Sequence, residues 1–227
     1  MRKYSRISCF IYFFSGVLFV FSPVLGSDAL TFILKALIVP SLLVFFLATK
    51  ARPAYMEDKF IIAALIFSWL GDILLQFKHG GELFFLIGLL AFLMTHIFYT
   101  IVFFGAAGEF IFFKSKKPLI LIIIVYGSLT IYTILPGLGN MQIPVTIYGL
   151  IITGMVIAAL SRFGKVNDQS YLLVFLGALL FLISDSLIAF DKFKQAFPFS
   201  EVLIMGTYLA AQFMIILGII KQEKKST

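Results

Sequence analysis

One segment of twenty residues decides the fold class of this chain: Tyr171–Phe190, with the sequence YLLVFLGALLFLISDSLIAF. It carries one charged residue, Asp185, and otherwise consists of apolar and small residues. A helix of about 20 such residues spans the roughly 30 Å hydrocarbon core of a bilayer. A charged side chain in such a segment is costly and usually functional. The segment therefore predicts a transmembrane helix with a functional carboxyl group.

A second segment, Phe60–Phe77, has the same character. Its central part, Ile66–Leu75, reads IFSWLGDILL and places Asp72 among apolar residues. Because two separate spans each keep one carboxyl group in hydrocarbon, Asp72 and Asp185 are the first candidates for catalysis.

The composition of the whole chain agrees with a membrane protein. Of 227 residues, 61% are hydrophobic and 13% charged, and the mean hydropathy is +1.08. The chain therefore has too few polar residues to cover the surface of a water-soluble protein. We expect an integral membrane protein of the bacterial cytoplasmic membrane. The single cysteine, Cys9, excludes a disulfide framework within the chain and a Cys-based zinc site.

Eight apolar segments predict an all-α, polytopic bundle of eight transmembrane helices that forms one domain over residues 1–227. Turn signals such as Gly26-Ser27-Asp28, Gly80-Gly81 and Pro136-Gly137 separate them. The segments are Ser8–Leu25, Ala29–Leu47, Phe60–Phe77, Leu83–Phe104, Pro118–Leu135, Pro144–Leu160, Tyr171–Phe190 and Glu201–Ile220.

The basic residues predict the orientation of this bundle. Fourteen of the 18 Lys and Arg residues fall in the two terminal stretches and in alternate connections, and only Lys78, Lys192 and Lys194 fall on the other side. Cytoplasmic loops carry the excess of Lys and Arg, so both termini are expected in the cytoplasm. The net charge of +7 is spread over short loops without a long basic run, so we expect no nucleic-acid partner. An alternative for the first segment is a signal peptide.

Polar side chains in four of the predicted helices fall at a similar depth. With about 1.5 Å of rise per residue, Asp72 lies about 18 Å and Asp185 about 21 Å from the cytoplasmic edge. The same count gives about 21 Å for Lys35. Tyr208 and Gln212 share one helix face and come out at about 20 and 14 Å. We therefore expect these five side chains to converge on one layer.

Four further polar residues are candidates for lining this site. His96 comes out at about 10 Å, with Tyr99 one turn further on the same face, and both could form a lower wall. Ser68 lies one turn before Asp72, and Ser184 directly precedes Asp185, so both could donate hydrogen bonds. A purely structural interpretation also exists, in which the aspartates pair with a lysine or hydrogen-bond neighbouring helices.

Two nearby carboxyl groups suit acid–base chemistry. Removal from water disfavours the charged form of a carboxyl group, and a second carboxylate close by disfavours it further. One member of such a pair can then deliver a proton while its ionised partner accepts one. We therefore expect Asp72 and Asp185 to act as an acid and a base, in either order.

Short motifs along the second to eighth segments resemble, in order, those of the YhhN-type lysoplasmalogenases. One departure concerns the second segment, where members have Lys-Pro but here Lys35 precedes Ala36 and the proline is Pro40. The matching motifs are Phe67–Asp72, Gly88–Phe92, His96–Tyr99, Pro144-Val145 with Tyr148, Gly177–Asp185, and Tyr208 with Gln212.

The resemblance implies a membrane hydrolase that cleaves the vinyl-ether bond of lysoplasmalogen to a fatty aldehyde and a glycerophospho-headgroup compound. It makes Asp72 and Asp185 the catalytic candidates, and a lysophospholipid the substrate, with no metal or cofactor. Lys35 and Tyr208 would hold the substrate phosphate. The other expected substrate-binding residues are Gln212, His96, Tyr99, Ser68, Ser184 and Tyr148.

Other membrane proteins also place ionisable residues within the bilayer. A proton-coupled transporter would use the two residues as a relay. An intramembrane aspartyl protease carries Gly-x-Gly-Asp, but position 69 here is Trp. A seven-helix zinc hydrolase needs three His ligands and a water site, whereas this chain has only His79 and His96. The transporter is the main alternative.

Overall fold

The computed structural model describes residues 3–22, 26–50, 56–77, 81–107 and 117–223. Within these ranges the chain forms eight α-helices, two short 3-10 helices and no strand, which confirms the predicted all-α class. The α-helices are α1 (Lys3–Phe21), α2 (Asp28–Thr49), α3 (Met56–Leu75), α4 (Gly81–Ala107), α6 (Lys117–Ile134), α7 (Gln142–Ser161), α8 (Asp168–Phe193) and α9 (Ser200–Ile220), and the 3-10 helices are η3 (Leu135–Gly137) and η4 (Gly139–Met141).

Each predicted apolar segment overlaps one of these helices. The largest shift is in α1, which begins at Lys3 rather than Ser8. The predicted turn residues take turn and cap roles. Ser27 caps α2 by accepting a hydrogen bond from Leu30 N at 3.3 Å. Gly81 adopts a φ of +66°, which a residue without Cβ allows. Gly80, its predicted partner in the turn, lies outside the described residues.

Seven of the eight described α-helices are long and apolar enough to cross a membrane. The exception is α3, which carries Glu57, Asp58 and Lys59 in its first turns in addition to Asp72. Asp58 forms an ion pair with Lys50, directly after α2. The count of eight spans therefore stays a prediction.

The cytoplasmic placement of the termini also stays a prediction. Much of the basic charge behind it lies outside the described residues, namely Arg2, Arg52, Lys78, Lys114, Lys116, Lys224 and Lys225.

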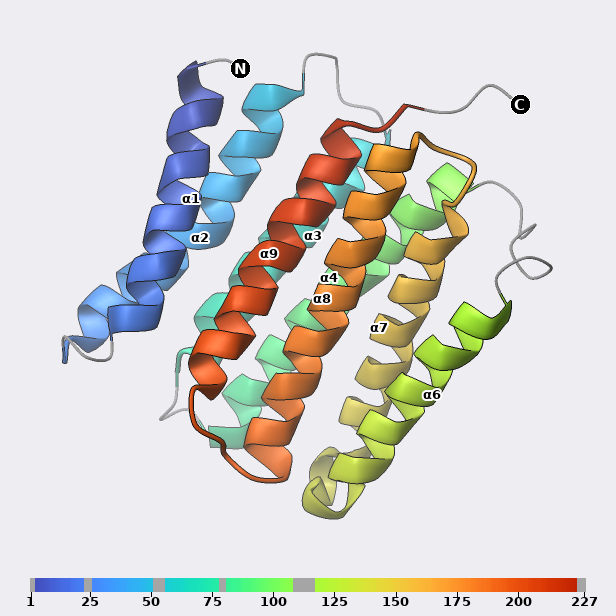
Figure 1. Cartoon of the computed structure of the whole chain (residues 1–227). Coiled ribbons are helices and arrows are strands. Elements are labelled where there is room, and N and C mark those ends of the chain that lie inside the picture. Colours follow the sequence, from blue (N-terminus) through green and yellow to red (C-terminus); the bar gives the residue numbers. More distant parts are fainter. Residues whose placement is uncertain (1–2, 23–25, 51–55, 78–80, 108–116, 224–227) are drawn as a thin grey trace. The chain divides into compact units, whose positions relative to one another are not determined.

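The chain divides into two compact units, Met1–Tyr99 (unit 1) and Thr100–Thr227 (unit 2), and helix α4 is continuous through the division. In unit 1, α1 lies beside α2, and the hydroxyls of Ser5 and Thr49 are hydrogen-bonded at 2.8 Å (Figure 1). Helices α3 and α4 meet through Thr95, whose hydroxyl donates to the Ala64 carbonyl at 3.1 Å.

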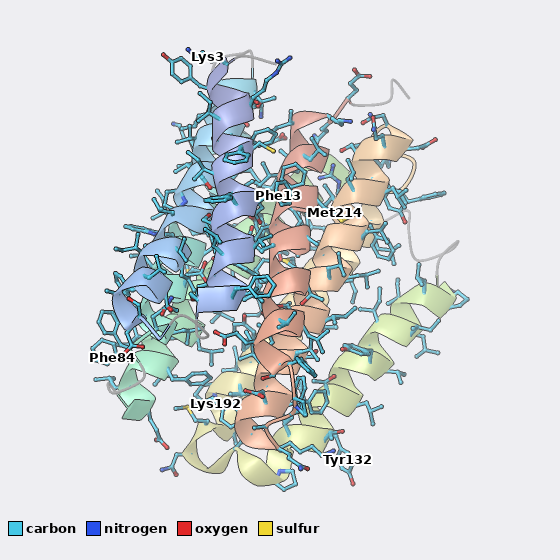
Figure 2. The ribbon with its side chains drawn as sticks, turned by 60° about the vertical axis from the view of Figure 1, so that its left-hand side comes forward. Lys3, Phe13, Phe84, Tyr132, Lys192 and Met214 are labelled. Atoms are coloured by element: carbon cyan, nitrogen blue, oxygen red, sulfur yellow. The ribbon has the colours of Figure 1, made fainter. Side chains whose placement is uncertain are left out.

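Consecutive helices of unit 1 run in opposite directions. Figure 2 shows Lys3, at the start of α1, and Phe84, near the start of α4, at opposite ends of the unit. This is the arrangement of four consecutive antiparallel helices, and short connections favour it.

In unit 2, helices α9, α8, α7 and α6 lie side by side (Figure 1). Small residues allow α8 and α9 to approach closely: a Cβ on Gly177 would lie 2.9 Å from the Ala211 carbonyl oxygen. Ser170 also donates across this interface to the Gly218 carbonyl at 2.7 Å. Tyr132 and Lys192, near the ends of α6 and α8, lie at the same end of unit 2 (Figure 2).

Candidate functional site

In unit 1, Asp72 is held by a lysine from the neighbouring helix. Asp72 Oδ1 lies 3.5 Å from Lys35 Nζ, and the two side chains are 3% and 15% exposed. The ammonium also lies 5.0 Å from the ring centroid of Phe19 in α1, within the range of a cation–π interaction. Helices α1, α2 and α3 thus build one charged pair in a largely apolar interior. Similar depths had placed Lys35 in one layer with both aspartates, and the structure pairs it with Asp72.

Tyr12 contributes a phenol to the same region. It is not among the site residues that the sequence predicted. Its side chain is fully buried in α1, and the charge of Asp72 and the phenol of Tyr99 both act on it. The first segment resembles a signal peptide in sequence, and this pattern does not mark its polar residues as part of a site. A tyrosine in the middle of an apolar segment was the available signal.

The other predicted residues of unit 1 are all buried. Ser68, His96 and Tyr99 each have no exposed surface. Ser68 precedes Asp72 by one turn of α3, while His96 and Tyr99 lie one turn apart on α4. The interior of unit 1 therefore contains the carboxyl group of Asp72, the ammonium of Lys35, the hydroxyl groups of Ser68 and Tyr99, and the imidazole of His96.

In unit 2, Asp185 is held by a phenol. Tyr148 Oη in α7 donates a hydrogen bond to Asp185 Oδ2 in α8. Tyr208 in α9 lies close enough to act electrostatically on Tyr148. Gln212 Nε2 in turn donates to Tyr208 Oη at 3.4 Å. The edge of Phe181 packs against the Tyr208 ring, with centroids 5.5 Å apart. Three helices thus carry two hydrogen-bonded pairs of predicted polar residues that lie near one another.

Ser184 does not take the predicted role beside Asp185. Its hydroxyl donates to the Ile204 carbonyl of α9 at 3.0 Å. Consecutive residues on a helix point about 100° apart, because one turn contains 3.6 residues. Ser184 therefore faces the helix interface and contributes there to packing.

A pocket lies next to Asp185 between α6, α7 and α8. Its empty volume is about 380 Å³, and it is partly open. Its wall comes from residues between Gly127 and Ile134, between Val145 and Thr153, and between Leu182 and Ala189. Tyr148 and Asp185 both line it. The sequence predicted no site residue on α6, because the apolar part of this helix contains no charged residue.

The groups in these two clusters are suited to proton transfer. A carboxyl group, a phenol and an ammonium can each hold or move a proton. Within the described ranges, no three His, Cys, Asp or Glu side chains gather as metal ligands would. The facing of Asp72 and Asp185 across one chamber remains a prediction.

Comparison with known proteins places the chain among named enzymes. It is 29% identical to lysoplasmalogenase TMEM86B of Mus musculus over 97% of this chain and 87% of the relative. It is 33% identical to lysoplasmalogenase TMEM86A of Bos taurus over 72% of this chain and 66% of that relative. A lysoplasmalogenase of Mycobacterium bovis is 28% identical over 75% of this chain and 64% of that protein. No solved structure matches the chain significantly.

The part of the chain that matches the family model contains both polar clusters except Tyr12. The YhhN family model matches residues 30–219, which include every predicted site residue and leave Tyr12 outside. The match extends over most of the chain, from α2 to α9. The chain therefore belongs to the YhhN family.

Proposed function

We propose that this protein is an integral membrane hydrolase that cleaves the vinyl-ether bond of a lysoplasmalogen. Three relatives with this name, two animal and one mycobacterial, support the reaction class. The observation that carries the proposal is the hydrogen bond from Tyr148 to Asp185 at the wall of a mainly apolar pocket. It fixes a carboxyl group where a lipid chain can reach it.

The reaction consists of proton transfers and the addition of one water molecule. An acid protonates the β-carbon of the vinyl ether, and the α-carbon becomes an oxocarbenium carbon. A base removes a proton from water as the water oxygen bonds to that carbon. The resulting hemiacetal then breaks its bond to the glycerol oxygen, which takes up a proton, and the chain leaves as an aldehyde. General acid–base catalysis of this kind contributes about 10²–10⁴-fold.

The neighbours of the two aspartates suggest their roles. Asp185 accepts a hydrogen bond from Tyr148 through Oδ2, and in its protonated form this carboxyl group delivers the proton to the β-carbon. Asp72 forms an ion pair with the ammonium of Lys35, so its carboxyl group takes part as a carboxylate. In this assignment Asp185 is the acid, and Asp72 is the base that also stabilises the oxocarbenium charge.

This mechanism has structural requirements that form part of the proposal. It requires that both carboxyl groups reach the same vinyl ether and that all eight helices span the membrane with cytoplasmic termini. The charged first turns of α3 then lie at the membrane surface, where Asp58 pairs with Lys50. An ammonium has three donors, so Lys35 can bind Asp72 and a substrate phosphate together. Tyr208 would be the second phosphate contact.

Aldehyde release from the purified protein tests the proposal. The substrate is a lysoplasmalogen in mixed micelles, and the readout is the fatty aldehyde captured by a hydrazine reagent. We expect wild type to release aldehyde, and Asp72→Asn and Asp185→Asn each to lose about 10²-fold or more. Asp28→Asn, at the exposed start of α2, is the matched control and should keep full activity.

Two further substrates sharpen the result. A lysolipid with a saturated ether has no β-carbon that can be protonated to an oxocarbenium ion, so it should stay intact. An acyl lysolipid should release no fatty acid if the chemistry is specific for the vinyl ether. Normal activity in both aspartate variants would reject their assignment. Proton movement across liposomes without aldehyde release would instead identify a transporter.

A further inference from the structure

The pocket beside Asp185 has a mainly apolar wall and one polar end. Two of its hydroxyl groups are used within their own helices. Thr153 donates to the Gly149 carbonyl at 2.6 Å, and Ser186 donates to the Leu182 carbonyl at 2.7 Å. These donors are directed to the backbone, so the wall around them presents mostly carbon. The polar end is formed by Asp185 with its hydrogen-bonded phenol.

We propose that this pocket binds the first carbons of the alkenyl chain of a single-chain lipid, with the vinyl-ether carbons beside Asp185. The inference rests on the proposed function and adds the place where the chain is held. An apolar wall lets methylene groups pass from the hydrocarbon of the bilayer into the pocket without burying an unsatisfied polar group. The polar end, formed by Asp185 and Tyr148, would lie beside the vinyl ether, which is the only reactive group of the alkenyl chain.

The size of the pocket limits how much of the chain it holds. The empty space of about 380 Å³ includes the part that opens to the surroundings, so the enclosed room is much smaller. The pocket spans Leu182 to Ala189, or about 10 Å along α8. A long alkenyl chain therefore places only its first part here and leaves through the open side.

The helices around the pocket connect it to the hydrocarbon of the bilayer. Leu129 on α6 and Leu150 on α7 are 60% and 62% exposed, and both helices carry further exposed apolar residues. Such faces contact lipid tails in a membrane. The remainder of the chain can thus stay in the hydrocarbon while its first carbons occupy the pocket.

Ala189 offers a way to fill the pocket. It lies four residues after Asp185 on the same face of α8, and it lines the pocket with only a methyl group. Ala189→Phe would place a ring in the space assigned to the chain. Ile183→Phe is the matched control, because Ile183 is on the same helix but is 38% exposed and does not line the pocket.

Photolabelling tests occupancy without depending on turnover. The probe is a long-chain lysolipid with a diazirine near the first carbons of its chain, added to the full-length protein in nanodiscs. We expect mass spectrometry to find label on pocket residues such as Ile131, Ile152 and Ala189. Ala189→Phe should lower this labelling about tenfold or more, while Ile183→Phe should leave it unchanged.

Turnover gives a second, independent comparison. Ala189→Phe should lose long-chain lysoplasmalogen cleavage but keep hydrolysis of a vinyl ether with a very short chain, because Asp185 and Tyr148 are untouched. Unchanged thermal unfolding of this variant would show that it folds. If this variant instead cleaves neither substrate and unfolds at a lower temperature than wild type, photolabelling of the wild-type protein decides whether the chain occupies the pocket.

The outcomes separate this inference from the proposed function. Aldehyde release with label confined to residues outside the pocket would overturn the inference and leave the hydrolase standing. Label in the pocket without aldehyde release by wild type would support chain binding and reject the hydrolase. Equal labelling of wild type and a folded Ala189→Phe would also overturn the inference.

Discussion

The phenol of Tyr148 in α7 donates a hydrogen bond to Oδ2 of Asp185 in α8. The other intramembrane aspartate, Asp72, has the Lys35 ammonium 3.5 Å away. A phenol gives one hydrogen bond and carries no charge, whereas an ammonium compensates a full negative charge. Two carboxyl groups with different partners are the arrangement that allows separate roles in proton transfer.

Replacing Tyr148 by Phe should lower kcat about 10²-fold and change KM little, because the variant keeps the shape of the pocket but no longer fixes the carboxyl group of Asp185. Steady-state aldehyde release over a range of substrate concentrations measures both constants. Tyr132→Phe, a change of the same kind at a side chain that is 75% exposed, should alter neither. A higher KM at an unchanged kcat would make Tyr148 a substrate-binding residue and contradict its positioning role.

The contact between α8 and α9 gives a prediction on stability. A Cβ on Gly177 would lie 2.9 Å from the Ala211 carbonyl oxygen and 3.0 Å from the Ile215 nitrogen, and these backbone atoms cannot move without separating the helices. Gly177→Ala should therefore destabilise the protein by about 1–3 kcal/mol, as overpacking does. Thermal unfolding in detergent, followed by circular dichroism, measures the change.

Gly206 in the same interface helix is the control. A Cβ there meets no atom within 4 Å, so Gly206→Ala should be neutral or stabilise by up to about 1 kcal/mol. If Gly177→Ala were as stable as Gly206→Ala, close approach would not hold α8 to α9.

Much of the architecture could be predicted from the sequence, because transmembrane helices are defined by local composition. All eight predicted segments correspond to helices, since hydrocarbon requires every backbone group to be bonded within its own segment. Depth counting also works along a straight helix with a fixed rise, and it placed Lys35 at a depth similar to those of Asp72 and Asp185 without deciding which of them it approaches; the structure pairs it with Asp72. The start of α1 was less well predicted, because Ser5 is polar but its hydroxyl is hydrogen-bonded to Thr49 of α2, a contact between distant residues.

The direction of each side chain around its helix was not predictable. A shift of one residue turns a side chain by about 100°, and this separates Asp185, which lines a pocket, from Ser184, which bonds to α9. The hydrogen bond from Tyr148 to Asp185 depends on how α7 packs on α8, which no local pattern reveals. Tyr12 was missed because apolar neighbours made its segment resemble a simple anchor or signal peptide.

The predicted orientation can be tested in intact cells. With Cys9 replaced by Ser, one new cysteine is placed at Lys194, after α8, or at Lys221, after α9; both positions are exposed. If both termini are cytoplasmic, a membrane-impermeant maleimide should label Lys194→Cys from outside and reach Lys221→Cys only after lysis. The reverse pattern would invert the topology, and labelling of both from outside would contradict the number of spans between them.

The ion pair of Asp72 and Lys35 makes the sharpest prediction on unit 1. Lys35→Met leaves a carboxylate of 3% exposure without its compensating charge, and it should destabilise the protein by about 3 kcal/mol. Adding Asp72→Asn removes that charge, so the double variant should recover most of the lost stability, to within about 1 kcal/mol. It should not recover aldehyde release, because the base is gone. Thermal unfolding and turnover of the four proteins in this cycle separate the two effects, with Lys192→Met at the exposed end of α8 as control. Full activity in the double variant would show that the pair serves packing alone, and catalysis would then have to be sought among the partners of Asp185.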